Sequence, residues 1–180
     1  MVYMFLADGF EETEAIGCLD VLRRAGIEVK TVSIDKRIVS GSHKIEVCAD
    51  ILKSEVDLKY IDGVILPGGM PGTTNLQKDE DVIRTLKYCA ENKKLVAAIC
   101  AAPMILGELG LLQGKKAVCY PGFEEYLTGA EVQKELVAAD RNFITAKGAG
   151  ASMLFGAEIA DWFEAGAGQD ILDQMQHPKR

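Results

Sequence analysis

The sequence has few of the residues from which metal centres and many hydrolase sites are built. Its 180 residues include two histidines, and the five cysteines form no C-x-x-C pair. Structural zinc sites use closely spaced cysteines and histidines, so we expect no bound metal. An odd number of cysteines also argues against a disulfide framework. We therefore expect free thiols in a reducing compartment, the cytoplasm.

Basic charge and long apolar runs are scarce as well. Twenty Lys and Arg residues stand against 27 Asp and Glu residues, for a net charge of −7, and no basic cluster is visible. This balance disfavours a partner that is a nucleic acid or an anionic membrane. The apolar runs are far shorter than the roughly 20 residues of a membrane span. Residues 2–7 are apolar but lack a preceding basic segment, unlike a signal peptide.

The composition is typical of a folded α/β domain. The chain is 48% hydrophobic and 26% charged, and its length suits a single domain over residues 1–180. Apolar strand-like segments alternate with helix-like segments, without an internal repeat or a linker. The alternation predicts a doubly wound α/β sandwich with a mostly parallel sheet. We expect strands at residues 2–7, 27–34, 45–48, 63–66, 95–99, 117–119, 136–138 and 142–146. We expect one helix that begins at the acidic residues 11–14 and ends at Gly26, and further helices at residues 79–92, 101–109 and 151–163.

Cys100 follows a segment, residues 95–99, that is apolar at every position. Such a segment suits a central parallel strand, and the apolar residues that follow indicate a helix that starts immediately. A side chain on so sharp a turn projects over the sheet edge where ligands bind, and the helix dipole there favours a thiolate. The small Ala101 would let a backbone N–H approach a developing oxyanion. The sequence leaves two interpretations open, a reactive nucleophile or a small buried residue.

Glycines follow two of the predicted strands. Gly68 and Gly69 would let a backbone amide approach a ligand, although an ordinary tight turn explains them equally well. Gly148 and Gly150 also join a strand to a helix, but Met153 stands where a dinucleotide fingerprint would have its third glycine. We therefore infer close packing there, and no nucleotide cofactor.

Three acids, Glu11, Glu12 and Glu14, mark the start of the first predicted helix. Acids are common at this position because they complement the helix dipole. Glu14 also adjoins the apolar face that carries Ala15. If it were drawn toward the sheet, its carboxyl would have a raised pKa and could transfer a proton.

A cysteine–histidine hydrolase is possible only through His43, because His177 lies in the C-terminal tail. His43 falls in a predicted turn far from Cys100 in sequence. A surface turn residue is the simpler interpretation, and a catalytic partner of Cys100 is the alternative.

Five segments, in this order, together resemble one protein family. They are residues 8–14 (DGFEETE), 23–27 (RRAGI), 66–69 (LPGG), 97–103 (AAICAAP) and 145–150 (TAKGAG). The combination resembles the DJ-1/PfpI (ThiJ) superfamily, and its DJ-1-like branch in particular. The resemblance implies a flavodoxin-like three-layer α/β/α sandwich with a nucleophile elbow, related to class I glutamine amidotransferases. It also implies a homodimer without a metal or organic cofactor.

The resemblance assigns roles to individual residues. Cys100 matches the elbow nucleophile and Glu14 the buried carboxyl that hydrogen-bonds to it. Gly69 and Ala101, with Gly68 beside them, match the amides of the oxyanion pocket. The implied activity is a glutathione-independent glyoxalase, or a deglycase, that acts on small 2-oxoaldehydes. Alternatives are an oxidative-stress sensor or chaperone that uses an oxidisable cysteine and, third, a thiol amidase or peptidase.

Two positions depart from the family pattern. DJ-1 itself has a His-Pro pair near the cysteine, where this chain has Tyr120 and Pro121. Tyrosine has a pKa near 10 in solution, so Tyr120 can hydrogen-bond but is a poor base at neutral pH. The PfpI-type peptidases carry a histidine directly after the nucleophile, where this chain has Ala101. The sequence therefore favours Cys–Glu chemistry, with Tyr120 or His43 as possible accessory residues.

Overall fold

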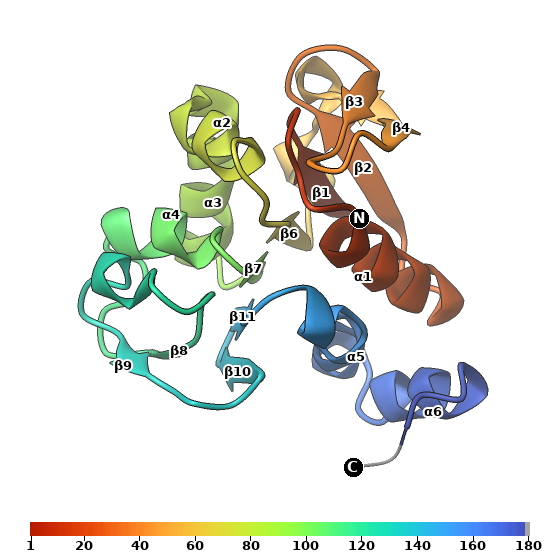
Figure 1. The fold of residues 1–180 in the computed structure, drawn as a ribbon, viewed down its shortest axis with the longest axis vertical. Helices are drawn as coiled ribbons and strands as arrows, with labels where there is room; N and C mark the ends of the chain where they lie inside the picture. Colours follow the sequence, from red (N-terminus) through yellow and green to blue (C-terminus); the bar gives the residue numbers. More distant parts are fainter. Residues whose placement is uncertain (179–180) are drawn as a thin grey trace.

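A seven-stranded sheet forms the centre of the computed structural model, which describes residues 1–178 (Figure 1). The strand order is β10-β11-β7-β6-β1-β2-β5. All neighbours pair in parallel except β10 and β11, which are antiparallel. In that order the strands are Val137–Asp140, Phe143–Ala146, Leu95–Ile99, Gly63–Leu66, Val2–Leu6, Val29–Ser33 and Ile51–Leu52.

Helices cover both faces of the sheet, which gives three layers (Figure 1). One face carries α1 (Glu12–Arg24), α5 (Ser152–Phe163) and α6 (Ala167–Gln174). The other carries α2 (Gly72–Lys78), α3 (Glu80–Glu91) and α4 (Pro103–Glu108). Two small sheets lie outside the centre, an antiparallel hairpin of β3 (Ile38–Ser40) and β4 (Glu46–Cys48) and a parallel pair of β8 (Lys116–Ala117) and β9 (Glu131–Val132). Short 3-10 helices span Lys53–Glu55, Leu58–Tyr60, Glu124–Tyr126 and Ala149–Ala151.

Strand β7 shows why this sequence forms a three-layer fold. All five of its side chains are fully buried. Leu95, Ala97 and Ile99 join the apolar core beneath α1 and α5, whereas Val96 and Ala98 join the core on the opposite face. A strand that is apolar on both faces needs cover on both. The predicted α/β sandwich with a mostly parallel sheet is therefore confirmed.

Several predicted elements differ from the structure in extent. The helix expected at residues 101–109 begins only at Pro103, because Ala101 and Ala102 complete a turn. The strand expected at 117–119 is the two-residue β8, which pairs with β9 outside the main sheet. Helices α2 and α6 were not predicted, since neither has a long apolar repeat. Strand 136–138 is β10, shifted to Val137–Asp140.

No helix among residues 1–178 is both long and apolar enough to cross a membrane.

Candidate active site

Cys100 lies at the tight turn between β7 and α4, and the turn is fixed by hydrogen bonds on both sides. The Cys100 N–H donates to the carbonyl of Ala146 at 2.9 Å, and its carbonyl accepts from the Tyr120 N–H at 2.8 Å. Its φ is +64°, in the left-handed region that non-glycine residues enter at a cost of about 1–2 kcal/mol. The neighbouring strand β11 and the segment after β8 thus hold Cys100 in a strained backbone conformation.

Glu14 reaches this turn from the first turn of α1. The helix is capped by Glu11, whose side chain accepts a hydrogen bond from the Glu14 N–H at 2.6 Å. The Glu14 side chain is only 1% exposed, and its carboxyl accepts from the Gly68 N–H at 2.9 Å. Burial raises the pKa of Glu14 to about 7, against the lowering effect of its hydrogen bonds with Cys100 and Gly68. A carboxyl with this pKa can both give and take a proton near neutrality.

Two glycines after β6 allow Glu14 and Cys100 to approach each other. A Cβ on Gly68 would lie 2.5 Å from the Cβ of Cys100 and 2.7 Å from Oε2 of Glu14. Gly69 has φ of +88°, and a Cβ there would lie 2.4 Å from the backbone nitrogen of Glu11. A side chain at Gly68 would therefore push Cys100 and Glu14 apart, and one at Gly69 would displace the connection between β1 and α1. Close approach, rather than a simple tight turn, is what these glycines provide.

Cys100 and Glu14 form a coupled pair. Burial raises the pKa of the Cys100 thiol to about 12, and the charge of Glu14 adds to this effect. Hydrogen bonds from the backbone amides of Ala101 and Gly69 act in the opposite direction and lower the pKa of the thiol. The pair therefore avoids carrying two negative charges: the Glu14 carboxyl titrates in the neutral range while the Cys100 thiol keeps its proton. Burial is the largest influence on the pKa of Cys100 and acts against the thiolate that we expected from the helix dipole, and α4 begins only at Pro103.

Tyr120 and Gly148 border the same region. Tyr120 is 50% exposed, and its ring meets the edge of Phe123 at a centroid distance of 6.5 Å. A Cβ on Gly148 would lie 3.2 Å from the Tyr120 ring and 3.8 Å from Oε1 of Glu14. The sequence interpretation assigned Gly148 to helix packing and missed its place beside Glu14. The signal that could have found it is a glycine two residues after the end of β11.

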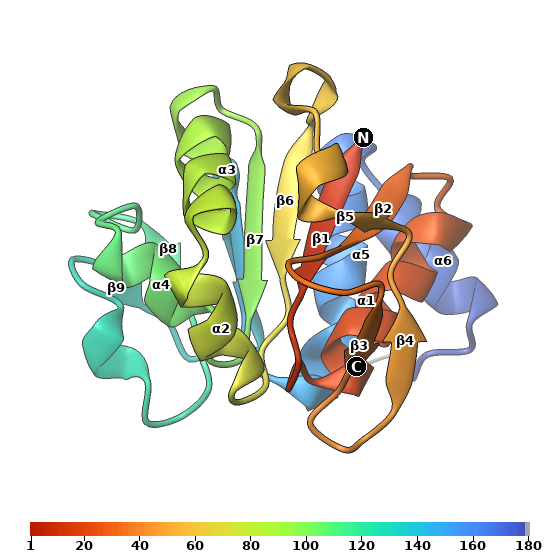
Figure 2. The same cartoon turned by 90° about the horizontal axis from the view of Figure 1, so that it is seen from above.

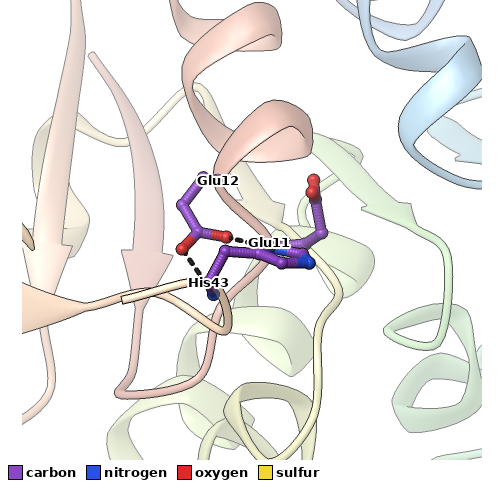
Figure 3. Close-up of side chains that lie close together, drawn as sticks. All are labelled: Glu11, Glu12 and His43. Atoms are coloured by element: carbon purple, nitrogen blue, oxygen red, sulfur yellow. Dashed lines mark hydrogen bonds and ion pairs between the residues drawn. The ribbon is translucent and has the colours of Figure 1, made fainter. Parts of the chain in front are cut away.

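His43 contacts Glu12 rather than Cys100 in the part of the chain that the structure describes. Figure 3 shows the Glu12 carboxylate held by the backbone N–H of His43 at 2.7 Å and by its Nδ1 at 2.9 Å. Burial acts to raise the pKa of Glu12, but hydrogen bonds from the His43 side chain and from backbone N–H groups, including those of His43 and Ile45, together outweigh it and lower the pKa to about 2. The same hydrogen bond raises the pKa of His43. The His43 side chain is 71% exposed, as expected of a surface turn residue.

Glu11, Glu12 and His43 place possible ligand atoms within 4.8 Å of one another. The Glu12 oxygens already accept hydrogen bonds from His43, Ser42 and Ile45, and Glu11 caps α1. These interactions explain the cluster as an ion pair that attaches the β3–β4 loop to α1. It gives no separate indication of a metal.

The other four cysteines differ from Cys100 in their surroundings. Cys18, Cys89 and Cys119 are buried among apolar side chains, and burial raises the pKa of each thiol. Cys48 is exposed on β4. Cys100 alone among the five lies beside a buried carboxyl with backbone amides directed at its sulfur.

Known proteins resemble this chain in sequence and in fold. The chain is 34% identical to protein dj-1beta of Drosophila melanogaster over 161 residues, which cover 88% of this chain and 86% of that protein. The solved structure of oxidized DJ-1 from Toxoplasma gondii matches with a TM-score of 0.94 at 33% identity, covering 99% of this chain and 98% of that one.

Two further relatives differ in length and in name. The chain is 37% identical to the DJ-1 homolog B of Arabidopsis thaliana over 88% of its own length, but it spans only 36% of that protein. It is 30% identical to the deglycase PfpI of Pyrococcus furiosus, over 82% of this chain and 90% of that protein. The DJ-1/PfpI family model matches residues 1–161. The chain therefore belongs to the DJ-1/PfpI family.

Proposed function

We propose that this protein is a cofactor-independent enzyme that converts small 2-oxoaldehydes to hydroxy acids through Cys100 and Glu14. The observation that carries the proposal is the buried Glu14 carboxyl, with a pKa near 7, hydrogen-bonded to a thiol toward which two backbone amides point. Relatives named deglycases at about 30% identity agree with an action on reactive carbonyl compounds.

The first step forms a covalent adduct. The Cys100 sulfur attacks the aldehyde carbon, and the thiol proton passes to Glu14, so that a thiolate is generated only as the C–S bond forms. The aldehyde oxygen becomes an oxyanion, which the N–H groups of Gly69 and Ala101 stabilise. Glu14 then gives its proton to this oxygen, which leaves a neutral hemithioacetal and an ionised Glu14.

The second step moves a proton between adjacent carbons. Ionised Glu14 removes the hydrogen from the hemithioacetal carbon and gives it to the ketone oxygen, which forms an enediol. Glu14 then takes the hydroxyl proton from the sulfur-bearing carbon and gives it to the neighbouring carbon. The product is a thioester of Cys100 with a 2-hydroxy acid. Water hydrolyses this ester, releases the acid and restores the thiol. From methylglyoxal and one water the product is lactate, with no net oxidation.

The test is lactate formation from methylglyoxal by the wild-type protein and by two variants, Cys100→Ser and Glu14→Gln. We expect turnover by the wild type, none by the serine variant and a rate at least about 100-fold lower for the glutamine variant. Absence of lactate from wild type, or full activity in either variant, would disprove the proposal. A panel of amide substrates tests the amidase alternative, which Ala101 in place of a histidine disfavours.

The same geometry favours a redox sensor as the second candidate. A sulfinate at Cys100 would accept hydrogen bonds from the Gly69 and Ala101 amides and from protonated Glu14. Treatment with a small excess over two equivalents of peroxide, followed by intact mass analysis, separates the two functions. Selective gain of two oxygens at Cys100 by a protein without aldehyde turnover would support sensing over catalysis.

We also propose that residues 1–180 act as one domain and assemble as a homodimer. The proposal rests on the family, since the chain covers most of several relatives but only about two fifths or less of the two plant proteins. Light scattering coupled to size exclusion would measure the mass directly, and a monomeric mass at micromolar concentration would contradict it.

A further inference from the structure

A cavity lies at the end of the sheet opposite to Cys100. It has a volume of about 550 Å³ and is formed where α3 ends, where β10 turns into β11 and where α5 ends. Figure 2 shows the α3–β7 connection at the end of the sheet away from the strand arrowheads. The five residues of β7 lie between this end of the sheet and Cys100, which corresponds to roughly 17 Å. The lining residues are Ala90, Glu91, Lys93, Lys115, Arg141, Asn142, Phe143 and Trp162.

Aromatic rings form the apolar part of this cavity. Trp162 is the single tryptophan of the chain and is 36% exposed. Its indole N–H donates to the Arg141 carbonyl at 3.2 Å, and its ring meets the edge of Phe163 at a centroid distance of 4.9 Å. These contacts fix the orientation of the indole, which leaves a rigid ring available for stacking.

Three cations surround the rings. Lys93, Lys115 and Arg141 line the cavity together with one acid, Glu91. The Nζ of Lys115 lies 4.9 Å from the centre of the Phe143 ring. Neither lysine has an ion-pair partner among residues 1–178, and the Arg141 guanidinium, 80% exposed, is 3.8 Å from Asp140. The site is thus locally positive on a protein whose net charge is −7.

Two of these cations have a backbone conformation that glycine adopts more easily than other residues. Lys93 has φ of +55° and Arg141 has φ of +59°. Elsewhere in the chain eight left-handed positions are occupied by glycine. A lysine or arginine in this region costs about 1 kcal/mol relative to glycine, so both cations are present despite a local conformational cost.

We propose that this cavity binds a small anion that carries a planar aromatic ring. The ring would stack against Trp162, and the anionic group would lie between Lys93, Lys115 and Arg141. This combination of aromatic walls and a few convergent charges is typical of small-molecule sites. The site is independent of the chemistry at Cys100.

The emission of Trp162 provides the assay, because no other tryptophan contributes. Adenosine 5′-monophosphate and naphthalene-2-sulfonate serve as probes, the first by tryptophan emission and the second by calorimetry. Adenosine and inorganic phosphate serve as the ring and the anion alone. We expect saturable binding of at least one complete probe, much weaker binding of adenosine and of phosphate, and weaker binding at high salt.

The variants Lys93→Gly and Arg141→Gly remove charge while relieving the backbone. We expect the double variant to weaken binding about ten-fold without lowering the unfolding temperature. Lys44→Gly is the matched control, since Lys44 is also a lysine with positive φ, at +69°, but lies in the β3–β4 loop. Its binding should equal that of wild type. Absence of saturation by both probes below about 5 mM, equal affinity for adenosine and its phosphate, or unchanged binding in the double variant would overturn the proposal.

Discussion

The backbone N–H of Gly68 donates a 2.9 Å hydrogen bond to the carboxyl of Glu14. Gly68 is also so close to Cys100 that a Cβ on it would lie 2.5 Å from the Cβ of that cysteine. One residue without a side chain thus orients the carboxyl and permits its approach to the thiol. The connection after β6 is therefore as important to the pair as the two elements that carry Glu14 and Cys100.

Replacement of Gly68 by alanine should impair activity only by changing the positions of Cys100 and Glu14. The added methyl group would push Cys100 and Glu14 apart, and a displacement of about 1 Å can lower the rate about 100-fold. The measurement is kcat/KM with methylglyoxal beside the unfolding temperature. Gly150→Ala is the matched control, because a Cβ there meets nothing within 4 Å. Equal activity of Gly68→Ala and wild type would contradict the proposed site geometry.

Glu14 should make the protein less stable as the pH rises. Its pKa is raised from 4.5 to about 7 in the folded state, so the folded protein binds the proton more tightly than the unfolded chain. Stability therefore falls between about pH 4.5 and 7. Relative to Glu14→Gln, the wild type should lose roughly 3 kcal/mol across this window in urea unfolding.

Glu158→Gln controls for carboxyl burial elsewhere. Burial also raises the pKa of Glu158, but this residue lies on α5 and lines a cavity with Gln169 and Leu172 of α6. We expect this variant to retain wild-type aldehyde turnover while Glu14→Gln does not. A pH dependence of stability that Glu14→Gln leaves unchanged would assign the effect to other groups.

Glu12 should stabilise the protein with a pH dependence opposite to that of Glu14. Its pKa is lowered from 4.5 to about 2 in the folded protein, so its contribution is present above pH 4.5 and is lost as the pH falls toward 2. Glu12→Gln should lower the unfolding free energy at pH 7 by about 1–3 kcal/mol, since it weakens several partly buried hydrogen bonds. The deficit should vanish near pH 2.

His43→Ala should have a smaller effect than Glu12→Gln. The backbone N–H at position 43 still donates to the carboxylate, and only the ring interaction is lost. Glu46→Gln, at an exposed position of β4, is the control and should match wild type. A larger loss in His43→Ala than in Glu12→Gln would show that the ring, and not the carboxylate, attaches the loop.

Alkylation should distinguish the five thiols. Cys48 is exposed and Cys100 is partly exposed, whereas Cys18, Cys89 and Cys119 are buried. Iodoacetamide should add one group quickly to Cys48 of the folded protein and a second group slowly to Cys100, because the raised pKa of Cys100 leaves little thiolate. Cys48→Ser should gain only the slow group, and the denatured chain should gain five groups. Intact mass reads each number. Reaction at Cys119 in the folded state would show that its burial is transient.

Local sequence was enough to predict most of the fold. Residues 95–99 are apolar at every position, which indicated a strand covered on both faces, and the structure confirms it. Helix α2 was missed because Gly72, Thr73 and Thr74 have low helix propensity and the segment is short. Its burial against β1 and α3 stabilises it, and such contacts are not visible in a local pattern.

The candidate site could be predicted only in part from the local sequence. The position of Cys100 after an apolar strand marked it as a candidate, but Glu11, Glu12 and Glu14 were alike as acids at a helix start. In the structure Glu11 caps the helix, Glu12 holds the β3–β4 loop and Glu14 turns into the core. Their three different roles depend on segments far away in sequence.

The sequence by itself determined the α/β order, the place of Cys100 at a strand end and the scarcity of histidine that disfavours a cysteine–histidine pair. Tertiary structure decided which carboxyl meets the thiol, and that burial, not a helix dipole, dominates the pKa of Cys100. The physical reason is the sequence distance over which each effect acts. Periodicity follows from neighbours a few positions apart, whereas desolvation and hydrogen bonding depend on groups that the fold brings within a few ångströms.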